Sequence, residues 1–130
     1  MSNFNKLVKN RCEKIHSVLA SKAKEYAVDN NRFHNFDLAA AVNNTTPEKA
    51  LWGMATKHLV SVIDIVNSPE TVSLELIEEK IGDMINYLIL LEGLLKRRQK
   101  IALKKETFSD LIPTLGEITA YRQSTPPGKD

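Results

Sequence analysis

The sequence contains little cysteine, glycine or proline, and each shortage excludes a class of structure. Cys12 is the only cysteine among the 130 residues, which excludes an internal disulfide and a cysteine zinc site. It falls on an apolar helical face, so we expect a small buried side chain there. Five glycines and five prolines are few for a turn-rich sandwich, and this scarcity favours long helices.

The sequence also shows no pattern typical of a signal peptide or of a membrane-spanning helix. Residues Met1–Lys9 lack the apolar centre of a signal peptide. The apolar stretch Ile85–Leu95 is too short to span a bilayer and contains Glu92 and Gly93. We therefore expect a cytoplasmic protein without a membrane partner.

The charge is uneven, although the net charge is only +2. Six cations form a basic run, namely Lys96, Arg97, Arg98, Lys100, Lys104 and Lys105. Cations near the end of a long helix stabilise its negative C-terminal end. A phosphate or nucleic-acid contact is the alternative interpretation. The run has no interleaved aromatic residues, so we expect no nucleic-acid partner.

Hydrophobic periodicity predicts an all-α protein, a helical bundle of three long helices with short additional helices. The first long helix, Lys6–Ala27, should bury one stripe that runs from Val8 to Tyr26. The other two are expected at residues 47–67, after a cap at Thr45 or Thr46, and at residues 74–106, after a cap at Ser73. Residues 28–36 should form a loop and residues 37–42 a helical turn or two. The predicted organisation is a bundle domain at 1–106, a docking helix at 107–122 and a flexible tail at 123–130.

The second and third long helices each carry two stripes. In the third helix one stripe has alternating gaps of four and three, formed by Ile77, Ile81, Met84, Leu88, Leu91 and Leu95. Its other stripe is formed by Glu79, Asp83, Tyr87, Leu90 and Leu94. The second helix has one stripe through Leu51 and His58 and another through Trp52 and Ile63. A small monomer cannot cover so many apolar faces, so we predict a homodimer or homotetramer in which these helices complete the core.

Polar residues of the loop and helices could line one shared pocket. The candidates are Lys22, Tyr26, Arg32, His34, Asn35, Lys57, Asp64, Glu79, Asp83, Asn86 and Tyr87. Glu79 and Asp83 lie one helical turn apart and can hold Mg²⁺, which prefers oxygen ligands. Arg32 suits phosphate, because its guanidinium forms paired hydrogen bonds. Phosphate-binding glycine-rich loops, zinc patterns and nucleophile–base motifs are absent from the sequence.

Several of these candidates also have an ordinary structural interpretation. Lys22 can be a surface lysine whose stem lies along the core, and His34 can be a simple loop histidine. Lys57 and Asp64 can form a weak surface pair, although an inward-facing polar strip is favoured on so apolar a helix. His58 is expected in the core with one hydrogen bond.

Four segments carry a resemblance to a known family: Lys22-x-x-x-Tyr26; Arg32-Phe33-His34-Asn35-Phe36; Thr46-Pro47-Glu48-Lys49-Ala50-Leu51 with Lys57-His58; and Glu79-Lys80-Ile81-Gly82-Asp83 with Asn86-Tyr87. Over about residues 22–95 the pattern resembles small phage and prophage proteins of the nucleotide-modification-associated domain group. That group is linked to the MazG-like all-α nucleotide pyrophosphatases. The resemblance implies a helical, often oligomeric fold, a nucleotide ligand and, for a phage protein, the host cytoplasm.

In the MazG-like enzymes, Mg²⁺ bound by acidic residues on two helices positions the water that cleaves a nucleoside triphosphate to monophosphate and pyrophosphate. Glu79 and Asp83 match the second acidic helix, with a gap of four residues in place of three. The paired glutamates of the first acidic helix are absent, and Lys57, Ser61 and Asp64 stand in that region.

Three functions are compatible with these observations. The first is a Mg²⁺-dependent nucleotide pyrophosphatase or related phosphohydrolase. It assigns Glu79, Asp83 and Asp64 to the metal, Glu79, Asp83 and Lys57 to catalysis, and Lys22, Tyr26, Arg32, His34, Asn35, Asn86 and Tyr87 to the ligand. The second is a non-catalytic protein that sequesters a nucleotide or a nucleotide-derived signal. The third is a helical interaction or scaffold protein whose polar strip is surface.

Overall fold

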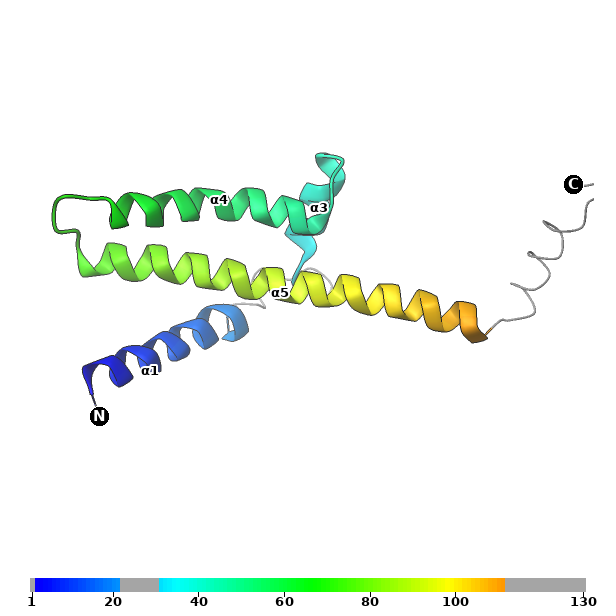
Figure 1. Cartoon of the computed structure of the whole chain (residues 1–130), viewed down its shortest axis with the longest axis horizontal. Coiled ribbons are helices and arrows are strands. Elements are labelled where there is room, and N and C mark those ends of the chain that lie inside the picture. The colour runs from blue at the N-terminus through cyan, green and yellow to red at the C-terminus, as the bar shows by residue number, and fades with distance from the viewer. Residues whose placement is uncertain (1, 22–30, 112–130) are drawn as a thin grey trace, which may run out of the picture. The chain divides into compact units, whose positions relative to one another are not determined.

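The computed structural model describes residues 2–21 and 31–111, and all regular structure in these residues is helical (Figure 1). The elements are α1 (Asn3–His16), the short π-helix η1 (Ser17–Ser21), α3 (His34–Val42), α4 (Pro47–Val66) and α5 (Leu74–Leu111). By their internal contacts, residues 1–94 and residues 95–130 form two compact units. None of the described helices is long and apolar enough to cross a membrane.

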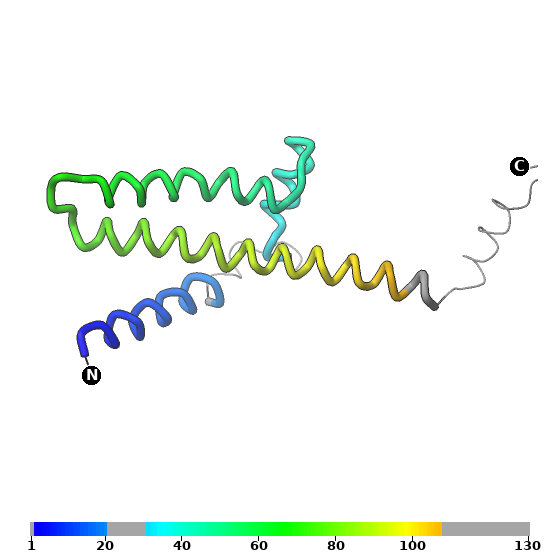
Figure 2. Tube along the Cα trace, in the orientation of Figure 1, coloured from blue at the N-terminus to red at the C-terminus, as the bar shows by residue number. Residues whose placement is uncertain are grey.

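The starts of α4 and α5 are fixed by side-chain caps, as the sequence predicts. The hydroxyl of Thr46 accepts a hydrogen bond from the backbone N–H of Lys49 at 3.2 Å, and Pro47 occupies the first helical position. The hydroxyl of Ser73 accepts from the N–H of Leu76 at 3.1 Å. Figure 2 follows the chain along α4, through the short turn and back along α5, which places the two helices antiparallel.

The core of the first unit lies where α3, α4 and α5 meet. Its buried side chains are Phe36 and Ala40 of α3, Leu51 and Ala55 of α4, and Leu94 of α5. Phe33, Met54, Met84, Tyr87, Leu90 and Leu91 pack around this cluster. α3 thus contributes Phe36 and Ala40 to the core that it forms with α4 and α5.

α1 differs from the predicted helix in its bounds and in its burial. It begins at Asn3, capped by Ser2, and changes to the wider η1 turn after His16. The predicted continuation through Lys22–Ala27 lies outside the described residues. None of the α1 side chains is buried, and Val8 is 44% exposed. The predicted buried stripe is therefore wrong over this helix, which contacts α5 through hydrogen bonds from the polar side chains of Arg11 and Lys14.

The expected burial of Cys12 is also wrong, because the residue is exposed and its thiol is free. The burial expected of α4 is also incomplete: Leu51 and Ala55 are its only buried residues, and Trp52 is 46% exposed. Apolar periodicity identifies the apolar face of a helix, but it does not show whether another helix of the same chain packs against that face.

In the second unit, α5 continues past its predicted end at Glu106 to Leu111. Every residue from Arg98 to Thr107 is exposed. The rest of the predicted docking helix and the predicted tail lie outside the described residues.

Candidate functional site

Two hollows in the first unit share three lining residues, Val18, Asp83 and Asn86. The aromatic hollow, about 250 Å³, is lined in addition by Leu19, Arg32, Asn35, Phe36, Tyr87 and Leu90. The charged hollow, about 320 Å³, is lined in addition by Arg11, Lys14, Ser17, Glu75, Glu78, Glu79 and Gly82. The shared residues make the two hollows neighbours, with Asp83 and Asn86 between them.

The wall of the aromatic hollow is a series of ring contacts. Tyr87 meets Phe36 edge to face, with ring centroids 6.5 Å apart and an angle of 69° between the planes. On its other side Tyr87 stacks on His58, with centroids 4.9 Å apart. Partial burial raises the pKa of Tyr87, and the nearby Asp83 carboxylate raises it further. The phenol therefore keeps its proton and remains available as a hydrogen-bond donor at neutral pH.

Asp83 and His58 form a contact between α5 and α4. The Oδ2 atom of Asp83 lies 3.3 Å from Nδ1 of His58, and the two side chains are 36% and 22% exposed. Since His58 also stacks on Tyr87, this contact links the carboxylate to the aromatic wall. The sequence predicts a core histidine with one hydrogen bond at His58; in the structure the residue is half-buried, and its polar contact is the one with Asp83.

Asn86 contributes an acceptor that nothing in the described chain uses. Its Oδ1 atom is buried and has no hydrogen-bond partner among the described residues. A buried carbonyl oxygen without a donor costs free energy, roughly 1–3 kcal/mol. Asn86 lines both hollows, but its buried Oδ1 atom is exposed in neither, so a ligand N–H group reaches this oxygen only if the Asn86 side chain turns.

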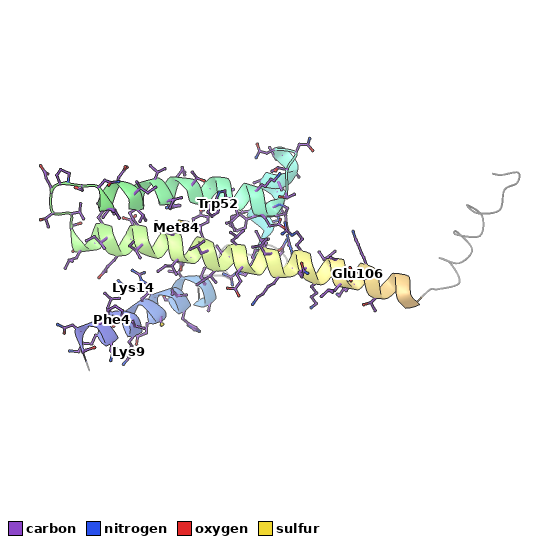
Figure 3. All side chains as sticks on the ribbon, in the orientation of Figure 1. Phe4, Lys9, Lys14, Trp52, Met84 and Glu106 are labelled. Atoms are coloured by element: carbon purple, nitrogen blue, oxygen red, sulfur yellow. The ribbon has the colours of Figure 1, made fainter. Side chains whose placement is uncertain are left out.

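The charged hollow is formed where α1 lies on α5. Figure 3 marks Lys14 on the side of α1 that faces α5, and its ammonium lies 2.6 Å from Oε2 of Glu78. This hydrogen bond lowers the pKa of Glu78. Arg11 donates to the backbone oxygen of Glu78 at 3.1 Å and lies over Gly82, where a Cβ would be 2.5 Å from Nη1 of Arg11. The guanidinium of Arg11 thus occupies the space that a side chain at position 82 would need.

Most of the predicted ligand residues within the described chain lie around these hollows. Arg32, Asn35, Asp83, Asn86 and Tyr87 line the aromatic hollow, and Glu79 joins Asp83 and Asn86 in the charged hollow. Lys22 and Tyr26 lie outside the described residues. His34 is the first residue of α3, half-buried, and lines neither hollow.

The predicted strip on α4 does not join the site. Asp64 lines a separate hollow with Ser61 and Lys80, so it does not lie with Glu79 and Asp83. Lys57 is exposed and lines neither of the two adjoining hollows. The inward orientation expected of this strip is therefore corrected, because the neighbouring His58 is the residue of α4 that turns toward Asp83.

Sequence reasoning did not include Arg11 or Lys14 among the candidate site residues, although both line the charged hollow. The one signal that could have found them is Gly82, a glycine inside a long helix that needs a close neighbour to justify its cost.

In the part of the chain that the structure describes, no group of three acidic, histidine or cysteine side chains is placed to hold a metal ion together. Glu79 and Asp83 nevertheless both line the charged hollow, one turn apart. Mg²⁺ is commonly held by one or two carboxylates, waters and the phosphates of a ligand. The donors present fit a metal that arrives with phosphate, and they do not form a closed protein site.

Comparison with known proteins adds no relative, since no family model, curated protein or solved structure matches this chain.

Proposed function

We propose that the protein binds a nucleotide together with Mg²⁺, with the base in the aromatic hollow and the phosphates in the charged hollow. The observation that carries the proposal is the meeting of two chemically different hollows at Asp83 and Asn86. Together their volumes reach the range of small-molecule sites, about 300–1,000 Å³. The proposal places the protein in the cytoplasm, where nucleotides are available.

The aromatic hollow suits a heterocyclic base. The rings of Tyr87 and Phe36 line it, and a base can stack on an aromatic face. The unpaired Oδ1 of Asn86 can accept an N–H group of the base once the Asn86 side chain turns this buried atom toward the hollow. Arg32 and Asn35, at the same hollow, supply donors for ribose or base oxygens.

The charged hollow explains why a metal belongs to the proposal. Its lining contains two more carboxylates than cations, so a bare triphosphate would meet net repulsion. Mg²⁺ supplies positive charge that the phosphates and the carboxylates of Glu79 and Asp83 can share. Lys14 and Arg11 then contact the phosphate oxygens on the α1 side.

Calorimetric titration of the full chain tests the proposal with a nucleoside triphosphate, its monophosphate and its nucleoside, each with Mg²⁺ and with EDTA. We expect binding of the phosphorylated ligands in Mg²⁺ and its loss in EDTA. Tyr87→Leu removes the stacking ring and should weaken binding tenfold or more, since a stacked base contributes about 1–3 kcal/mol.

A matched pair of lysines on α1 provides the control. Lys14→Ala removes a cation that lines the charged hollow and should weaken binding of the triphosphate. Lys9→Ala removes an exposed cation of the same helix that lines neither hollow, and binding should be unchanged. If no nucleotide binds with or without Mg²⁺, the proposal is wrong and the interaction-protein interpretation gains support.

Hydrolysis is a second candidate, favoured by the acidic lining beside the proposed phosphate position. Glu75, Glu78, Glu79 and Asp83 all line the charged hollow. In the hydrolytic version, Asp83→Asn abolishes Mg²⁺-dependent release of pyrophosphate from the triphosphate. Binding without any pyrophosphate release would identify the protein as a sequestering one.

A further inference from the structure

α4 carries an apolar stripe that no described part of the chain covers. Trp52, Val60, Ile63 and Val66 are 46%, 49%, 47% and 77% exposed. At 3.6 residues per turn these four side chains fall within about a third of the helix circumference. Of the two buried residues of α4, Leu51 falls about a third of a turn from the centre of this stripe, and Ala55 adjoins its Val66 edge. We call these four exposed residues the open stripe.

Two polar side chains beside the open stripe already donate hydrogen bonds to the α4 backbone. The hydroxyl of Thr56 donates to the backbone oxygen of Trp52 at 2.7 Å. The side-chain amide of Asn67 donates to the backbone oxygen of Ile63 at 3.0 Å. If a partner covers the stripe, both of these donors keep their hydrogen bonds. Their burial therefore does not carry the free-energy cost of an unpaired donor.

Gly53, next to Trp52, adds an independent observation. A Cβ at Gly82 or Gly93 would press on Arg11 or Phe33, so these two glycines are explained within the chain. A Cβ at Gly53 would meet nothing within 4 Å. Glycine inside a helix costs about 1 kcal/mol relative to alanine. The close approach of a helix from another chain would account for Gly53.

We propose that the open stripe is the interface of an antiparallel homodimer, in which α4 packs on α4 of a second copy across a twofold axis near Val60. The stripe spans about 21 Å from Trp52 to Val66. Antiparallel pairing brings the bulky Trp52 end of each stripe toward the smaller Val66 of the partner subunit. Because the axis is twofold, the contact between Trp52 and the partner's Val66 occurs at both ends of the interface.

Charge supports the same orientation. Lys57 and Asp64 are both exposed and lie seven residues apart, on the same flank of the open stripe. In an antiparallel pair a flank faces the same flank of the other helix. Lys57 then approaches Asp64 of the partner subunit, and the symmetry repeats this contact.

The amount of surface is sufficient. Four large side chains that are 46–77% exposed form a patch of a few hundred Å². Two such patches with their flanks reach the lower end of specific interfaces, about 1,000 Å² in total. None of the residues of the open stripe lines the aromatic or the charged hollow, so dimerisation and nucleotide binding can fail independently.

Sedimentation velocity and fluorescence of the full chain test the dimer, and Trp52 is the only tryptophan. We expect a dimer whose Trp52 emission shifts to the red as dilution dissociates it. Ile63→Glu should give a helical monomer with red-shifted emission. Phe4→Glu, at a 70% exposed position of α1, should leave the dimer intact. A chain that is monomeric at every concentration, or a dimer that survives Ile63→Glu, overturns the proposal.

Cross-linking tests the orientation in a Cys12→Ser background. Val60→Cys lies near the proposed axis, so two copies should join by a disulfide, which needs Cα atoms within about 7 Å. Trp52→Cys should not join to itself, because the two copies of this position are about 24 Å apart along antiparallel helices. Equal cross-linking at both positions would show a parallel pair and overturn the proposed arrangement.

Discussion

Asp83 is the residue at which the aromatic and charged hollows meet, and its neighbours fix its position. Its carboxylate lies 3.3 Å from Nδ1 of His58, and the His58 ring stacks on Tyr87 at 4.9 Å. None of these three side chains can turn away without losing a contact with another. The acidic group and the aromatic wall are therefore held in place before a ligand enters, which reduces the entropic cost of binding.

Tyr87 should make stability sensitive to alkaline pH. Its pKa is raised above the ordinary value of 10.0 by burial and by Asp83, so the unfolded chain loses this proton first as the pH rises. The stability that depends on the neutral phenol is complete below pH 10 and falls as the pH rises from about 10 through the higher folded-state pKa.

Urea unfolding of wild type and Tyr87→Phe between pH 8 and about pH 11 measures this effect. The variant has no phenol to ionise at this position, so its stability should fall less steeply above pH 10. Identical slopes for the two proteins would contradict the assigned cause.

At the scale of the elements, helix starts could be predicted because they depend on local chemistry. Thr46, Pro47 and Ser73 have the side chains that a helix N-terminus needs, whatever packs nearby. The packing of α1 could not be predicted in this way. Its apolar repeat is real, but the choice of α3 as the cover of the α4–α5 hairpin depends on contacts far apart in the sequence.

Thr46→Ala and Thr45→Ala test the capping of α4. The structure selects Thr46, whose hydroxyl accepts from the N–H of Lys49. Removing this acceptor should lower the free energy of unfolding by about 1 kcal/mol. Thr45→Ala should have a much smaller effect, since Thr45 is exposed and contacts Ala40 only through its backbone N–H. Urea unfolding followed by circular dichroism measures both variants, and equal losses would argue against the assigned cap.

At the scale of the whole molecule, the site combines what the sequence could and could not predict. The residues on α5, including Asp83 and Asn86, were predictable because helical spacing places them on one side. Arg11 and Lys14 come from a helix that contacts α5 through polar groups, and polar contacts leave no periodic pattern. The separate position of Asp64 likewise depends on how α4 is rotated against α5.

The small core makes a final prediction about the molecule as a whole. Only five side chains are buried in the described part of the chain, whereas the open stripe of α4 remains exposed. If a second copy covers that stripe, association and folding are coupled, and the apparent stability depends on protein concentration. The midpoint of urea unfolding should rise with concentration for wild type and stay constant for Ile63→Glu. A constant midpoint for wild type would mean that one chain reaches its full stability alone, despite the apolar surface of α4.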